Sequence, residues 1–334
     1  MVLRGWRRAT VAGAAAVGLM LAPQVARAAD TVAFTIKDPR ISQSSGLTRD
    51  TTLQAYWTVN DSGAEGRVFA VDGTGKTLGT ANFRADVVDV EALAMAGRRL
   101  YVADIGDNGA TRSSVSVYSF DNLTPGNGTA TYRALDFAYP DGAHDAEALL
   151  VNPAGRLYLV TKDATGGIYA APSNPSRERM NTLVKVGDAP AYVTDGVFLP
   201  DGRIALRTYV SVEILDPTSY EVVARSPAPV QPQGESMAVD LAGTGLLLGS
   251  EGRSSTVYAV PVPDALRAVP SAGATPPAAT ASASGPAATD PTTEDDSGPT
   301  ADTNLPDGTR GAVGLAALVA VVAGVVVGLA RSRR

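Results

Sequence analysis

The stretch from residue 89 to residue 120 reads DVEALAMAGRRLYVADIGDNGATRSSVSVYSF, and it decides the fold of this chain. It contains three short runs rich in apolar, β-branched and aromatic residues, separated by a Gly97-Arg98 turn and by an acidic loop that contains glycine. Runs of this composition between turn residues are typical of antiparallel strands. The same pattern returns four more times along the chain, so this stretch is the repeating unit.

The five copies align on their first strands, at separations of 46, 56, 48 and 40 residues. Each copy continues through a turn into an apolar second strand and then a third. Sheet units of roughly 40–55 residues that recur in register are the signature of a β-propeller. We predict an all-β propeller of five blades, or six if an irregular loop hides a strand; a β-sandwich would not explain the register. The first strands begin at Ser45-Gly46-Leu47, Glu91-Ala92-Leu93, Glu147-Ala148-Leu149, Asp195-Gly196-Val197 and Glu235-Ser236-Met237.

A sixth β-rich run, from Thr31 to Ile36, precedes the first unit and has no unit of its own. The fifth unit, in turn, ends after its third strand. Because a closed ring removes open sheet edges, we predict that the N-terminal run supplies the missing outer strand of the last blade.

The N-terminal segment, residues 1–29, has the pattern of a secretory signal peptide. It combines a basic start, an apolar run and the small-x-small cleavage site Ala26-Arg27-Ala28. The Arg7-Arg8 pair leaves a twin-arginine route open beside the general secretory route. We therefore predict export, with the propeller domain spanning residues 30–265.

The C-terminal segment predicts a membrane anchor. Residues 311–330 are 20 uncharged residues, enough to span a hydrocarbon core of about 30 Å, and the basic residues 331–334 mark a cytoplasmic tail. Residues 266–310 are rich in Ala, Pro, Thr and Ser, which predicts a disordered stalk. The motif Leu305-Pro306-Asp307-Gly308-Thr309 resembles a sortase sorting signal with its last two residues reversed, so cell-wall attachment is the alternative. This composition and tail resemble those of high-GC Gram-positive bacteria.

Charge and composition exclude several classes of function. The formal net charge is −6, but eight of the 28 basic residues lie in the terminal segments, which leaves 20 basic against 34 acidic groups, or −14, between them. Such a surface repels nucleic acid and favours cations or basic partners. The chain has no cysteine, so it has neither disulfides nor a thiolate metal site. We expect a monomer with an extracellular ligand or protein partner.

The aligned start of the first strand carries an acid in four of the five copies. In a propeller this position lines the central channel, and converging carboxylates require a cation or many N–H donors. Oxygen-only ligands favour Ca²⁺, whereas the alternative is that each acid caps backbone N–H groups of a neighbouring blade. The loop 104–109 looks like a calcium loop without the EF-hand spacing, or it is a solvated turn. The predicted metal ligands are Glu91, Glu147, Asp195, Glu235, Asp104 and Asp107.

Other polar residues fall near the same predicted mouth. Lys162 and Arg207 end second strands, where they would bind an anionic substrate or pair with the acids. His144, the one histidine, would be required by a Ser-His-Asp hydrolase, but the chain has no GxSxG motif. We can therefore name no catalytic residue. The candidate ligand-binding residues are Asp61, His144, Lys162, Arg207 and Glu251.

These motifs resemble those of the extracellular propeller family with phytase-like esterase activity, over about residues 41–263. There is a looser similarity to calcium-dependent lactonase propellers, whose first blade carries a Glu-Gly pair. The resemblance implies a Ca²⁺-dependent hydrolase of phosphoesters or esters, in which only Lys162 and Arg207 are placed to bind phosphate. The motifs that carry it are Ser45-Gly46-Leu47, Asn60-Asp61-Ser62-Gly63, Asp89-Val90-Glu91-Ala92-Leu93, Gly234-Glu235-Ser236-Met237 and Gly249-Ser250-Glu251-Gly252.

Two functions follow from these patterns. The first is a binding module at the cell surface, since a stalked display without a complete catalytic set favours recognition. The second is a metal-dependent hydrolase, in which Ca²⁺-bound water is the nucleophile and the four aligned acids hold the metal.

Overall fold

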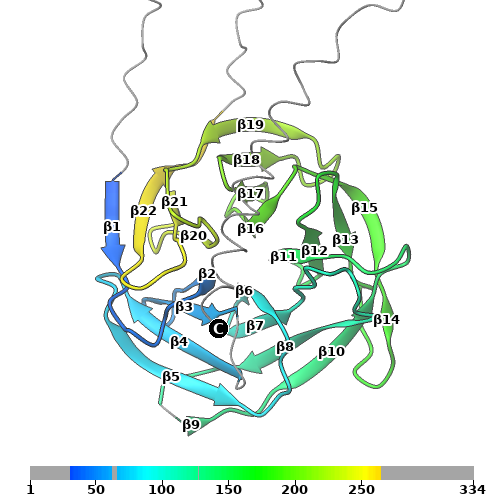
Figure 1. Ribbon diagram of the computed structural model, residues 1–334, viewed down its shortest axis with the longest axis horizontal. Coiled ribbons are helices and arrows are strands. Elements are labelled where there is room, and N and C mark those ends of the chain that lie inside the picture. The colour runs from blue at the N-terminus through cyan, green and yellow to red at the C-terminus, as the bar shows by residue number, and fades with distance from the viewer. Residues whose placement is uncertain (1–30, 62–65, 127, 265–334) are drawn as a thin grey trace, which may run out of the picture. The chain divides into compact units, whose positions relative to one another are not determined.

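The computed structural model describes residues 31–61, 66–126 and 128–264. These residues form five antiparallel sheets arranged around a common centre (Figure 1). The predicted five-bladed β-propeller is therefore confirmed.

Each blade is built from strands that follow one another in the sequence. Blade one contains β2 (Ser44–Asp50), β3 (Ala55–Asn60), β4 (Gly66–Asp72) and β5 (Thr77–Phe83). Blade two contains β6 (Val90–Ala96), β7 (Arg99–Asp104), β8 (Val115–Asp121) and β10 (Arg133–Ala138). Blade three contains β11 (Ala146–Val151), β12 (Leu157–Thr161), β13 (Gly166–Ala170) and β15 (Val184–Ala189). Blade four contains β16 (Val193–Phe198), β17 (Ile204–Thr208), β18 (Ser211–Leu215) and β19 (Val222–Pro227). Blade five contains β20 (Met237–Val239), β21 (Gly245–Leu248), β22 (Thr256–Pro261) and β1 (Thr31–Thr35).

The N-terminal strand closes the ring as predicted. β1 pairs antiparallel with β22 at the outer edge of blade five (Figure 1). Phe34 of β1 is buried and its ring lies 5.6 Å from that of Tyr56 in blade one. This strand therefore joins the last blade to the first.

Two short strands join further pairs of blades, and the sequence analysis did not predict them. β9 (Gly128–Thr129) leaves blade two and pairs parallel with β5 of blade one. β14 (Asn181–Thr182) leaves blade three and pairs parallel with β10 of blade two. Each adds a strand from one blade to the outer edge of the preceding one.

The hydrophobic core lies between neighbouring blades rather than inside one sheet. Five clusters of buried side chains fill the five interfaces; the one between blades one and two contains Trp57 and Phe120. The apolar residues therefore cover both faces of the central strands, as in β12, where every residue is buried. Because all five clusters and the closing strand lie within residues 31–264, this segment should fold as an independent domain.

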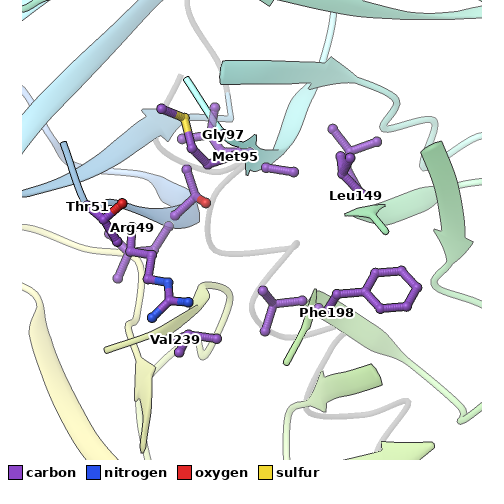
Figure 2. A pocket seen from close by; sticks show the side chains of 14 residues that line it. Arg49, Thr51, Met95, Gly97, Leu149, Phe198 and Val239 are labelled. Atoms are coloured by element: carbon purple, nitrogen blue, oxygen red, sulfur yellow. The ribbon is translucent and has the colours of Figure 1, made fainter. Parts of the chain in front are cut away.

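The first strands β2, β6, β11, β16 and β20 line the central channel. Their C-terminal halves surround a cavity of about 210 Å³, and Figure 2 shows Leu149, Phe198 and Val239 around it, with Arg49 at its side. The acids at the starts of these strands therefore lie toward the opposite end of the channel.

The predicted signal peptide, stalk, transmembrane helix and tail lie outside the described residues. Among the residues that the structure does describe, no helix has the length and apolarity needed to cross a membrane.

Candidate functional site

In blades one to four the first strand begins with a β-bulge, and the bulge sets which side chains share a position. The extra residue is Ser45, Glu91 and Glu147 in the first three blades. In blade four it is Thr194, so the sequence alignment on Asp195 is one residue off. Because a shift of one residue turns a strand side chain to the other face, Asp195 does not share the position of the other acids.

The starts of the first strands and the ends of the second strands bring seven carboxyl groups together at one end of the channel, which we call the acidic mouth. Burial is the largest cause that raises the pKa of Glu91, and the charges of Glu147 and Asp89 raise it further. Asp89 and Asp145 belong to this group and were missed, although each stands two residues before a predicted ligand in the sequence. The acidic mouth consists of Asp61, Asp89, Glu91, Asp145, Glu147, Glu235 and Glu251, with Lys162 and Tyr209 beside them.

A buried ammonium group already compensates part of this charge. Nζ of Lys162 lies 2.7 Å from Oε1 of Glu147 and 5.3 Å from the ring centre of Tyr209. Burial works against the charged form of Lys162, but Glu147 and Glu235 outweigh it and raise its pKa. Lys162 is therefore paired with an acid of the mouth, which is one of the two roles that the sequence left open.

Glu235 occupies the blade-five side of the mouth. The hydroxyl of Tyr209 donates to its Oε1 at 3.2 Å, and Gln233 interacts with the carboxylate. Its other oxygen, Oε2, is buried and accepts no hydrogen bond from a described residue. Burial raises the pKa of Glu235, while Lys162 opposes the rise.

Glu91 links blades one and two at the same level. The hydroxyl of Ser45 donates to Oε2 of Glu91 at 3.0 Å. Ser45 and Glu91 occupy equivalent bulges, so the aligned positions of two neighbouring blades are hydrogen-bonded to each other. The contact joins two blades and so gives Glu91 a structural role. The sequence analysis named a structural role as the alternative to metal binding for these acids.

Asp195 and Arg207 lie in the interface between blades four and five. The two oxygens of Asp195 accept from the backbone N–H groups of Gly196, at 2.7 Å, and Met237, at 2.6 Å. Arg207 is fully buried and donates to the carbonyls of Ser236 and Gly249 and to the side chain of Gln231, at 2.6–2.7 Å. Both residues therefore connect the two blades.

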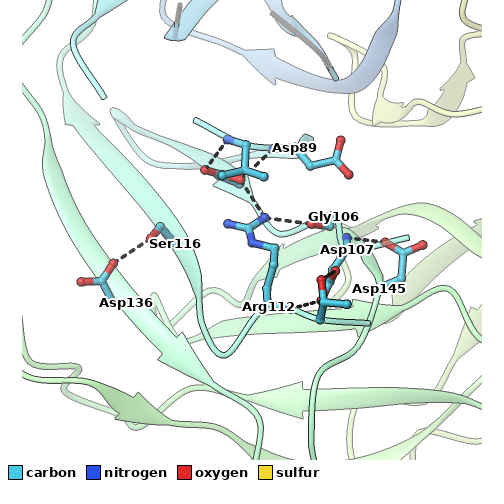
Figure 3. A network of polar contacts seen from close by, with 10 residues as sticks. Asp89, Gly106, Asp107, Arg112, Ser116, Asp136 and Asp145 are labelled. Atoms are coloured by element: carbon cyan, nitrogen blue, oxygen red, sulfur yellow. Dashed lines mark hydrogen bonds and ion pairs between the residues drawn. The ribbon is translucent and has the colours of Figure 1, made fainter. Parts of the chain in front are cut away.

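The acidic loop after β7 is organised by an arginine that the sequence analysis did not single out. Figure 3 shows Arg112 between the start of β6 and the loop: its Nη1 donates to Oδ1 of Asp104 at 2.9 Å and to the carbonyl of Gly106 at 2.8 Å. Asp107 accepts from the backbone N–H of Arg112 at 2.6 Å and donates its own N–H to Asp145 at 2.7 Å. The carboxylates of the proposed calcium loop thus bind a guanidinium and backbone donors.

His144 belongs to a separate polar cluster before β11. Its two ring nitrogens lie 3.3 Å from Asp163 and 3.1 Å from Asp141. The hydroxyl of Tyr169 lies 3.1 Å from Nε2 of His144 and donates to Asp141 at 2.8 Å. The histidine therefore bonds to two carboxylates of its own blade.

The donor set of the mouth does not fit a Ca²⁺ ion as it stands. Among the described residues, no three acidic or histidine side chains are arranged to hold a metal ion. The ammonium of Lys162 already occupies one side of Glu147. Calcium binding stays a prediction.

The carboxyl group of Glu251 predicts a pH-dependent stability. Burial and then the charge of Asp61 raise its pKa from 4.5 to about 8. Between these values the folded state binds more protons than the unfolded state, so this group lowers stability as the pH rises. We expect Glu251→Gln to raise the melting temperature at pH 8 and to change it little at pH 4.5. Glu178→Gln, in an exposed loop, is the control; an equal rise at both pH values would contradict the prediction.

Comparison with known proteins assigns no family to this chain. No protein-family model and no curated protein matches the sequence. A gluconolactonase from Xanthomonas campestris is similar in structure at 12% identity and a TM-score of 0.43, over 68% of this chain and 89% of that chain. A streptogramin B lyase is similar at 12% identity and a TM-score of 0.39, over 69% of this chain and 72% of that chain. The resemblance to the phytase-like family stays a prediction.

Proposed function

We propose that this chain is a binding module whose acidic mouth holds a ligand with a positively charged group. The charge of the mouth supports this, because its seven carboxyl groups outnumber the three cationic side chains that act on them, Lys162, Arg112 and Arg207. Burial raises the pKa of Glu91, Glu147 and Glu251, so part of the excess negative charge is relieved by bound protons. A cationic ligand would replace those protons.

The observation that carries the proposal is the buried oxygen Oε2 of Glu235. A buried acceptor without a donor costs free energy, on the order of 1–3 kcal/mol. Oε1 of the same carboxylate already accepts from Tyr209. A ligand ammonium that donates to Oε2 would satisfy this oxygen in a charge-assisted hydrogen bond.

The test is calorimetric titration of residues 30–265 with n-butylammonium chloride. We expect binding that strengthens from pH 5 to pH 8, because carboxyl groups with a raised pKa must release protons before they attract the cation. Glu235→Gln should weaken it about tenfold or more. Glu178→Gln should leave it unchanged, and sodium acetate should not bind. Equal affinity of the Glu235→Gln variant would refute this site.

The calcium-dependent hydrolase of phosphoesters, esters or lactones stays a prediction beside it. The same titration with CaCl₂, and a melting curve with and without EDTA, test the metal directly. A calcium-dependent rise in melting temperature together with turnover of a generic phosphoester or lactone would favour the hydrolase. Export and attachment to the cell membrane, or to the cell wall, are likewise proposals and place the ligand outside the cell.

A further inference from the structure

Large apolar or aromatic side chains are exposed in the loops around the acidic mouth. In an antiparallel blade, the loop from the second to the third strand leaves the sheet at the end where the first strand starts. The loop that leads into the next blade leaves at that end too. Five residues in such loops are 42–92% exposed, and we call them the apolar rim: Val88, Tyr192, Tyr209, Val210 and Val230.

Two members of the apolar rim lie directly beside residues of the mouth. Val88 precedes Asp89 in the chain. The backbone N–H of Tyr192 donates to the carbonyl of Asp163 at 3.1 Å, and Asp163 follows Lys162. The rim residue before blade two is therefore adjacent in the chain to an acid of the mouth, and the rim residue before blade four is hydrogen-bonded to the neighbour of Lys162.

The other three members are grouped on the side of blades four and five. The ring of Tyr209 covers the ammonium of Lys162. The carbonyl of Val210 accepts from the N–H of Ala228 at 2.9 Å, which brings the loop that carries Val230 beside it. Val230 is 92% exposed. The acidic mouth therefore has an apolar border on this side.

The backbone at Tyr192 supports a role for the rim. Its φ is +58°, a conformation that residues with a side chain rarely adopt. Strain of this kind clusters at sites that bind ligands. Here it holds an aromatic side chain in solvent, although a glycine would adopt the same conformation without strain.

We propose that the acidic mouth and the apolar rim form one docking surface for a polypeptide that presents a lysine or arginine side chain between apolar residues. The basic side chain would enter the mouth toward Glu235, and the flanking residues would cover the rim. A metal ion or a small amine would leave the rim in water, whereas interfaces between proteins combine an apolar, aromatic centre with charge complementarity. The inference rests on the proposed function and names the class of partner.

The experiment compares three capped peptides on residues 30–265: acetyl-Gly-Val-Lys-Val-Gly-amide, the same peptide with serines in place of the valines, and the same peptide with glutamine in place of lysine. We expect the valine–lysine peptide to bind about tenfold more tightly than the serine–lysine peptide. The glutamine peptide should not bind. In the double variant Val210→Ser, Val230→Ser, the valine–lysine and serine–lysine peptides should bind with equal affinity.

The matched control is Val184→Ser, another exposed valine, on the outer strand β15; this variant should keep the difference in affinity. Equal affinity of the serine–lysine and valine–lysine peptides would overturn the proposed docking surface. Binding of n-butylammonium in the same experiment would still support the proposed function. Binding of n-butylammonium without either peptide would also overturn the docking surface. If n-butylammonium does not bind, both proposals fail.

Discussion

Replacing Lys162 with methionine is expected to lower the free energy of unfolding by about 3–5 kcal/mol at pH 10. The methionine fills much of the same volume but leaves Glu147, 3% exposed, without its cation. Glu235 loses the same positive charge. Removing one partner of a buried ion pair is costly because the remaining charge has no solvent to compensate it.

The pH dependence separates this charge effect from a loss of packing. Burial raises the pKa of Glu147, and Lys162 opposes that rise, so the pKa should be higher still in the variant. Because that pKa is about 8 with Lys162 present, the carboxyl group is protonated in both proteins at pH 6, and the loss there should be smaller than at pH 10, where the carboxylate is charged in the parent protein. Urea titrations followed by circular dichroism at both pH values measure the difference.

Lys185→Met provides the control for this prediction. Lys185 pairs with Asp188 at 2.9 Å, but both side chains are exposed. We expect a change within about 0.5 kcal/mol. An equal loss for Lys162→Met at pH 6 and pH 10 would mean that its methylene groups, rather than its charge, stabilise the mouth.

The blades and the closing strand could be predicted because they depend on local patterns. Alternation of apolar runs and turn residues repeats along the chain, and the extra run at Thr31–Ile36 had only one open edge to fill. The short strands β9 and β14 could not be predicted in this way. Each has two residues without an apolar pattern, and each forms only because a neighbouring blade offers an edge.

The convergence of acids at one mouth followed from the fold, but their individual partners did not. Asp195 and Thr194 are adjacent, and only the position of the bulge decides which of them aligns with Glu91. A bulge depends on the pairing of two strands and leaves little trace in the sequence. Arg112 likewise reaches Asp104 across a loop whose path no pattern specified.

Replacing Arg207 alone with methionine is expected to lower the free energy of unfolding by about 3–5 kcal/mol. The loss should affect mainly the interface between blades four and five. Burial lowers the pKa of Arg207 to about 10, so it is charged at pH 7. The variant would leave the carbonyls of Ser236 and Gly249 without these donors. Arg207→Lys keeps the charge but cannot donate to three separated acceptors, so an intermediate loss is expected.

Arg203→Met is the control, since Arg203 pairs with Asp201 on an exposed turn of the same hairpin. We expect it to cost less than about 1 kcal/mol. The double variant Arg207→Met, Glu235→Gln should lose less than the sum of the single variants, because it removes a carboxylate that the arginine compensates. Additive losses would mean that the hydrogen bonds to blade five, and not this charge pair, account for the effect.

The selective effect of Arg207→Met on the interface between blades four and five follows from how the blades are joined. β9 joins blades one and two, β14 joins blades two and three, and β1 joins blade five to the first. Blades four and five are joined instead through the polar contacts of Arg207 and Asp195, in addition to their shared apolar cluster. We therefore expect Arg207→Met to accelerate amide hydrogen exchange in β20 and β21 before it does so in β6 and β7. Uniform acceleration in all blades would show instead that the ring opens only as a whole.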